Sequence, residues 1–273
     1  MHAQPDDPED SPDPRLDQAW DALEAGDPQA ALDLASAIEA ESHARWILEA
    51  SARLELDDLR GAREALDRAS ADRSLEEDAD LCWTAAEIAL REWNLEEARR
   101  LFERTASLER TTPALGRLAL CADALGDFAA ADRFLREAER MDPEGWTFPP
   151  RLSEDELHEV LDEAIGKLDE DFQEALEETP ILIEAMPSRE LLDSDDLAQT
   201  PPDMLGLFVG ASRLERAGSE ATMPASIHLF QRNLERACAD REDLVHELRV
   251  TLYHEIGHML GFDEDGVDRM GLA

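Results

Sequence analysis

Apolar side chains recur at helical spacing through the first half of the chain, in segments that are separated by short polar turns. One turn element occurs four times between Trp20 and Met141, and each copy ends on an alanine. These alanines are Ala31, Ala62, Ala98 and Ala131. Their separations of 31, 36 and 33 residues bracket the period of about 34 residues that a helix-turn-helix repeat shows. The pattern therefore predicts an array of helical hairpins.

A second set of positions repeats in the same register. Another alanine lies twelve residues before each of the first four: Ala19, Ala50, Ala86 and Ala119. Four residues after each of the turn alanines, Ala31, Ala62, Ala98 and Ala131, lies an apolar side chain: Ala35, Leu66, Phe102 and Leu135. Small residues at paired positions allow two antiparallel helices to approach closely, and the larger ones fill the space above that contact.

This stretch resembles tetratricopeptide repeats, most closely from Leu118 to Pro143, where LALCADALGDFAAADRFLREAERMDP carries the turn glycine, the small residues and a closing proline. The other three units lack that proline. The resemblance implies a TPR-like α-solenoid. Two roles stay open for it, support of a neighbouring domain or a concave surface that docks a peptide or protein.

The pattern changes after Met141, where Pro and Gly residues up to position 150 prevent a continuous helix. Ser153 and Glu156 then predict the capped start of a new helix that ends near Thr179. Three short apolar runs follow and predict strands of a small sheet: residues 181–183, 205–209 and 226–230. We therefore expect two domains, an all-α repeat array followed by a small α+β domain. The expected boundaries are a disordered tail at 1–15, the array at 16–145, a linker at 146–152 and the second domain at 153–273.

The last predicted helix begins after Asp240 and carries the motif His254-Glu255-Ile-Gly-His258. The two histidines lie one turn apart, so both imidazoles can reach one metal ion, and Glu255 can hold a metal-bound water. Gly261 follows at a position where a left-handed residue ends the helix and turns the chain back. The motif therefore indicates a metal site.

Charge narrows the classes of partner. The chain has 66 Asp and Glu against 26 Lys and Arg, which gives a net charge of −40, and Lys167 is its single lysine. A chain this acidic is not expected to bind nucleic acid or an anionic membrane surface. The first fifteen residues show neither the basic nor the apolar region of a signal peptide, no run of about 18 apolar residues follows, and the three cysteines are widely spaced. We therefore expect a cytoplasmic protein.

Residues from about 153 to 271 resemble the small bacterial zincin-like metallopeptidases called minimal zincins. The resemblance lies in an opening helix, the runs ILIEA, LGLFVG and IHLFQ, and the segment DREDLVHELRVTLYHEIGHMLGF. The family motif HExxHxxGxxD implies that His254 and His258 are zinc ligands and that Glu255 is the catalytic acid/base. It places the third ligand at position 264, which is Glu264 here rather than Asp, so Asp263 and Asp265 remain alternatives.

The resemblance implies a Zn²⁺-dependent peptidase that hydrolyses peptide bonds through a zinc-activated water, with a peptide or protein as substrate. Peptide substrates of zincins lie along an edge strand, so the resemblance also assigns backbone pairing to Ser226, Ile227, His228, Leu229 and Phe230. The repeats are expected to dock a protein partner. The alternative function is a repeat-based adaptor whose zinc site is structural or inactive.

Overall fold

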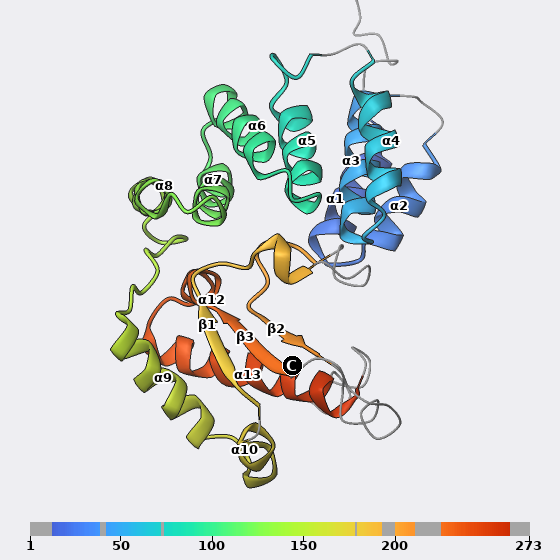
Figure 1. Cartoon of the computed structure of the whole chain (residues 1–273). Coiled ribbons are helices and arrows are strands. Elements are labelled where there is room, and N and C mark those ends of the chain that lie inside the picture. Colours follow the sequence, from blue (N-terminus) through green and yellow to red (C-terminus); the bar gives the residue numbers. More distant parts are fainter. Residues whose placement is uncertain are drawn as a thin grey trace, which may run out of the picture. The chain divides into compact units, whose positions relative to one another are not determined.

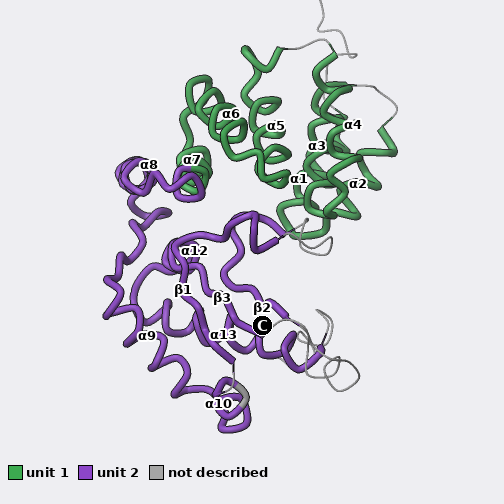
Figure 2. Tube along the Cα trace, in the orientation of Figure 1, with its two compact units in different colours: residues 1–121 green, residues 122–273 purple. Residues whose placement is uncertain are grey.

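The computed structural model describes residues 13–38, 42–71, 74–177, 179–192, 200–210 and 225–262. It divides the chain into two units, residues 1–121 and 122–273 (Figure 2). The domain boundary expected at residues 146–152 stays a prediction, and the unit that contains it begins earlier, at residue 122. Among the described helices, none is both long enough and apolar enough to cross a membrane.

The predicted helical hairpins are confirmed. The helices of the first unit are α1 (Pro14–Glu24), α2 (Pro28–Ser36), α3 (His43–Glu55), α4 (Leu59–Ala69), α5 (Ala79–Arg91) and α6 (Leu95–Leu108). They pack in the pairs α1 with α2, α3 with α4 and α5 with α6, and α2 and α4 each also contact the next hairpin. The division between the units falls within α7 (Thr112–Ala124), which is followed by α8 (Phe128–Met141) (Figure 1).

The small residues at the repeat positions have the role that the spacing predicts. All eight alanines of the two registers are completely buried: Ala19, Ala31, Ala50, Ala62, Ala86, Ala98, Ala119 and Ala131. Phe102 and Leu135, four residues after two of these alanines, are buried as well. A larger side chain at the alanine positions would separate the helices. The repeat therefore requires small residues at these positions more than it requires particular residue types.

The four hairpin turns share one backbone conformation. The residue five positions before each repeat alanine has a positive φ: 78° at Gly26, 57° at Asp57, 58° at Trp93 and 77° at Gly126. Only two of the four are glycine, the residue that adopts this conformation without steric cost. Asp and Trp hold the other two turns in the same geometry, which explains why the turn element is hard to recognise by its glycine alone.

The second unit contains a three-stranded sheet with helices along it (Figure 1). Its elements after α8 are α9 (Glu154–Gly166), α10 (Glu170–Leu176), β1 (Ile181–Glu184), η1 (Arg189–Leu192), β2 (Gly206–Val209), β3 (Ser226–Phe230), α12 (Gln231–Ala237) and α13 (Arg241–Leu260). The strand order is β1-β3-β2, with β1 parallel and β2 antiparallel to β3. The three predicted strands are therefore confirmed as strands.

The segment predicted as one helix from Ser153 to near Thr179 is two. The predicted capping box of Ser153 and Glu156 opens α9, but the chain leaves the helix at Lys167 and begins α10 after Asp169. The Tyr253 hydroxyl of α13 accepts a hydrogen bond from the Asp169 backbone N–H at 3.2 Å. Leu168, between the two helices, is buried in the core of this unit.

One face of the sheet forms the core of the second unit. Ile227 and Leu229 of β3 are fully buried with the apolar side of α13 and with α9. Side chains alternate along a strand, so Ser226 and His228 lie on the opposite face. The two faces of β3 therefore differ: Ile227 and Leu229 pack against α9 and α13, and Ser226 and His228 do not lie on that side.

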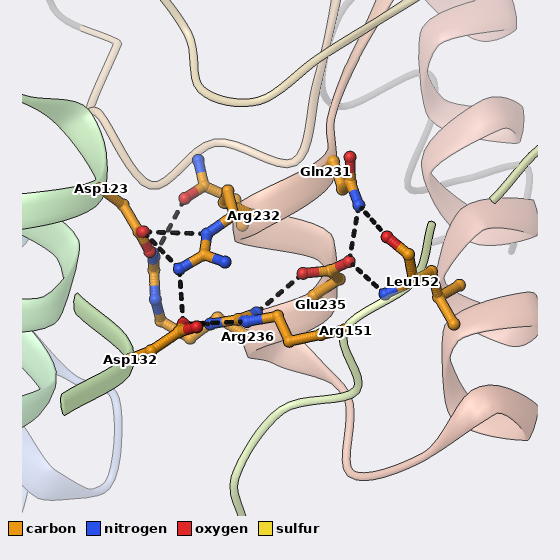
Figure 3. Close-up of polar contacts among 9 residues, drawn as sticks. Asp123, Asp132, Arg151, Leu152, Gln231, Arg232, Glu235 and Arg236 are labelled. Carbon is orange, nitrogen blue, oxygen red and sulfur yellow. Dashed lines mark hydrogen bonds and ion pairs between the residues drawn. The ribbon is translucent and has the colours of Figure 1, made fainter. Parts of the chain in front are cut away.

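A network of charged residues connects α12 with α8 and the end of α7, all within the second unit (Figure 3). Arg232 of α12 donates to Asp123 at 2.8 Å and to Asp132 at 2.7 Å. Arg236 also bonds to Asp123, and Arg151 bridges Asp132 to Glu235. Three arginines thus face three carboxylates, and the Asp123 and Glu235 side chains are almost completely buried. Because each charge has a partner, part of the cost of burying it is offset.

Candidate active site on helix α13

Helix α13 provides the frame of the candidate site. The Asp240 side chain accepts hydrogen bonds from the backbone N–H groups of Glu242 and Asp243, at 2.8 and 3.0 Å, and so caps the helix as expected. The apolar side of the helix is buried: Leu244, Val245, Leu248, Leu252, Ile256 and Met259. Packing along this side fixes the rotation of the helix, and with it the direction of the motif.

The two histidines of the motif converge on each other. His254 and His258 are half-buried, and their Nε2 atoms are 3.0 Å apart. Their rings meet edge to face with centroids 4.6 Å apart. Two imidazole nitrogens on one tetrahedral zinc, each about 2.0–2.1 Å from the metal, would be separated by about 3.3 Å. The pair therefore already has nearly the spacing of two ligands on one ion.

The end of α13 orients His258. Gly261 has φ 98°, its N–H bonds to His258 O at 2.9 Å, and the N–H of Phe262 bonds to Gly257 O at 3.1 Å, which is a Schellman motif. This turn brings the Phe262 carbonyl to 3.2 Å from His258 Nδ1. The Nδ1–H can donate to that carbonyl, which leaves the Nε2 lone pair for a metal.

Glu255 lies against strand β2. Its residue is 5% exposed, so the carboxylate sits mostly out of water. A Cβ added at Gly206 would lie 2.6 Å from Thr251 Cγ2 and 3.2 Å from Glu255 Oε1. Strand β2 and α13 can therefore approach this closely only because residue 206 lacks a side chain.

The donor set fits zinc as far as it is described. Two imidazoles with converging Nε2 atoms are the nitrogen ligands that zinc prefers, and Glu255 follows His254 directly in the sequence. The expected third ligand, Glu264, and its alternatives Asp263 and Asp265 lie outside the described residues. Within the described part of the chain no group of three His, Cys, Asp or Glu side chains could hold a metal ion. The ligand set His254, His258 and Glu264 thus stays a prediction.

The expectation that Ser226, Ile227, His228, Leu229 and Phe230 pair with substrate as an edge strand is wrong. They form β3, the central strand, which pairs with β1 on one side and β2 on the other. The Ile227 N–H already bonds to Pro180 O at 3.0 Å, and the Phe230 N–H to Leu205 O at 2.9 Å. The main chain of β3 is therefore occupied on both sides. Alternation within each run predicts a strand, but it does not encode the order of strands in a sheet.

His228 does not lie on the face of the sheet that packs against α13, the helix that carries the motif. It is buried on the side opposite Ile227 and Leu229, where Nδ1 lies 2.7 Å from Glu184 Oε2 and Nε2 lies 3.0 Å from Ser226 Oγ. Sequence reasoning missed this grouping because Glu184 comes from another strand. It also missed the role of Gly206, although a single glycine inside an apolar strand run is a known sign of close approach.

Comparisons with known proteins agree with this geometry in the C-terminal part. Residues 176–272 match the family model of the zincin-like metallopeptidases. No curated protein matches the chain. Among solved structures, the crystal structure of MamA is similar over 48% of this chain and 78% of its own, with 18% identity and a TM-score of 0.39, too low to carry an argument. Residues 176–272, which carry the converging histidines and Glu255, therefore form a zincin-like metallopeptidase domain.

Proposed function

We propose that the chain is a zinc-dependent peptidase. The observation that carries the proposal is the convergence of His254 and His258 on one side of α13, next to the buried Glu255. Two imidazole ligands and a carboxylate in this order are what metal-assisted hydrolysis of an amide requires. When bound, zinc supplies a Lewis acid and lowers the pKa of water to about 7.

The residues of the chain would then divide the work as follows. His254 and His258 hold the metal through Nε2, and the Phe262 carbonyl keeps the His258 ring in the required orientation. Glu255 acts as acid/base, since it can accept a proton from the attacking water and return it to the leaving amine. Its low exposure strengthens this role, because a carboxylate away from water interacts more strongly with charge that develops nearby.

We further propose that β2 receives the substrate. In the described sheet β2 pairs with β3 on one side only. Gly206, at its start, adjoins Glu255. An extended peptide that adds to this edge would run past the catalytic carboxylate, with main-chain hydrogen bonds as its anchor.

The purified full chain should bind about one zinc ion, and Glu255→Gln should abolish chelator-sensitive cleavage of an unstructured polypeptide while zinc stays bound. The matched control is Glu247→Gln, a carboxylate two turns earlier on α13, which should leave both properties unchanged. His246→Ala is the matched control for His258→Ala, because His246 is exposed on the same helix beside Arg249.

Other outcomes decide between the alternatives. Zinc bound without turnover on a broad peptide library would favour the adaptor with a structural or inactive zinc site. No zinc at all would refute both functions. If Glu264 is the third ligand, Glu264→Ala should weaken zinc binding more than Asp263→Ala or Asp265→Ala does.

The helical repeats contain a cavity that supports a docking role. It has a volume of about 160 Å³, and residues of α1, α3, α5 and α7 line it. Its lining includes the apolar Leu23 and Leu54, the indole of Trp83, the carboxylates of Glu55 and Glu87, and the guanidinium groups of Arg91 and Arg117, which pair with Asp57 and Glu87. We propose that a segment of the protein substrate docks here, because apolar surface mixed with paired charges of both signs suits a peptide that carries both apolar and polar side chains.

Filling the cavity tests this docking. Ser51→Trp, at a half-buried position in the lining, should raise KM for a long unstructured protein and leave KM for short peptides unchanged. Ser107→Trp is the matched control on the exposed surface of α6. An equal effect of both substitutions, or of Ser51→Trp on both substrates, would contradict the proposal.

We also propose a cytoplasmic location. Cys82, Cys121 and Cys238 are all buried thiols. Burial raises the pKa of the Cys238 thiol to about 12, with Glu247, Asp243 and Asp240 adding to the effect. Thiols of this kind are usual in a reducing compartment.

A further inference from the structure

Three side chains on the other face of the sheet form a hydrogen-bonded chain. Ser226 and His228 lie two residues apart on β3 and so share a face, while Glu184 comes from the end of β1. The Ser226 Oγ to His228 Nε2 distance is 3.0 Å, and the His228 Nδ1 to Glu184 Oε2 distance is 2.7 Å. Both distances are within hydrogen-bond range.

The two contacts determine which tautomer a neutral His228 adopts. A carboxylate can only accept, so the Nδ1–H donates to Glu184, and the lone pair of Nε2 is left to accept the Ser226 hydroxyl proton. A hydroxyl on Nε2 with a carboxylate on Nδ1 is the arrangement that activates a serine nucleophile.

Burial and access suit the same role. His228 is 5% exposed, so its ring is held in place, whereas Ser226 is half-buried. The β1 side of the group is open, because Leu182, which pairs with His228 in the strand register, is 45% exposed. The group lies on the sheet face opposite the one that packs on α13, so its chemistry does not depend on the proposed zinc site.

We propose that Ser226, His228 and Glu184 form a second, metal-independent nucleophilic site that acts on small esters with a good leaving group. Ser226 Oγ attacks the acyl carbon as its proton passes to His228 Nε2, and the C–O bond to the leaving group breaks. The leaving oxygen takes the proton, and the acyl group stays on Ser226. Water, deprotonated by His228, then attacks the acyl carbon, the bond from that carbon to Ser226 Oγ breaks, and His228 returns the proton to Oγ as the carboxylic acid leaves.

The test uses the full chain in excess chelator with p-nitrophenyl acetate. The wild-type protein should release p-nitrophenolate in a burst and carry an acetyl group on Ser226, located by peptide mapping. Ser226→Ala should remove the burst, and His228→Gln should slow acylation by about 100-fold or more. Glu184→Gln should slow it by at least about tenfold, because the imidazole loses its orienting partner.

Ser188→Ala is the matched control, since Ser188 is also half-buried and follows β1 closely. It should leave the burst unchanged. A folded wild-type protein that carries no acyl group on Ser226, or an equal burst in Ser226→Ala, would overturn the proposal. Peptide mapping of the wild-type protein gives this answer even if a variant does not fold.

Discussion

Gly206 is the residue on which the position of Glu255 depends. The backbone of β2 touches α13 at this point, and the contact is possible because nothing projects from residue 206 toward Thr251. The Glu255 carboxylate is thus positioned by the lack of a side chain on a neighbouring strand as well as by its own helix. A sequence motif restricted to α13 contains no information about this second constraint.

Under the proposed function, Gly206→Ala should therefore lower the rate of peptide hydrolysis and leave the zinc content unchanged. The added methyl group would lie 2.6 Å from Thr251 Cγ2, so the strand or Glu255 must shift, and a misplacement of about 1 Å can cost about 100-fold in rate. Measurements of kcat and zinc content would show a lowered kcat at unchanged stoichiometry. Gly166→Ala is the control, since a Cβ there meets nothing within 4 Å. Equal rates for both variants would contradict this role of Gly206.

At the scale of elements, α13 is the best-predicted part of the chain because its signals are local. Its N-cap, its apolar side and its terminating glycine are all visible within residues 240–261. The order of the strands is not local, so the central position of β3 could not be predicted from its own residues. The break between α9 and α10 was missed for the same reason, since Tyr253 bonds there from a distant element.

Asp240→Ala should destabilise the helix that carries the site. It removes the acceptor of two backbone N–H groups, which costs about 1 kcal/mol, or about 2–4 °C in Tm for a unit of this size. Asp169→Ala at the start of α10 provides the comparison, because Asp169 makes no side-chain cap hydrogen bond in the described structure. Thermal melts should show a larger decrease in Tm for Asp240→Ala than for Asp169→Ala, and an equal decrease would argue against the role of Asp240 as a cap.

At the scale of the whole molecule, the sequence indicated two folds in one chain but not how the second unit is held together. Repeat spacing and the His-Glu-His motif are each visible in the sequence. The arginine network was not foreseen, because its members are up to 113 residues apart, from Asp123 to Arg236. The third zinc ligand also stays a prediction, since residues 263–265 are not described.

The arginine network should make the stability of the second unit sensitive to acid. Burial alone would raise the pKa of Asp132, but Arg232 and Arg151 outweigh it and lower the pKa below its ordinary value of 3.8. The stabilisation is therefore present above pH 3.8 and is lost as the pH falls through the lower folded-state value.

Asp132→Asn should lower stability by about 1–2 kcal/mol near neutral pH, and the difference from wild type should shrink below pH 3.8. Denaturant unfolding at several pH values would measure it. Asp162→Asn, at an exposed position of α9, should show no such pH-dependent difference. A gap between wild type and Asp132→Asn that stays constant down to pH 2 would contradict the assignment.

The network also bears on how the protein responds to ionic strength. Dissolved ions screen exposed charges within about 10 Å at 0.1 M salt, but they reach buried pairs much less. In a chain of net charge −40, added salt thus relieves the mutual repulsion of the acidic surface, while the buried carboxylates of Asp123 and Glu235 keep their arginine partners. The joint between α12, α8 and the end of α7 is therefore suited to concentrated electrolyte, in which an exposed set of ion pairs would loosen.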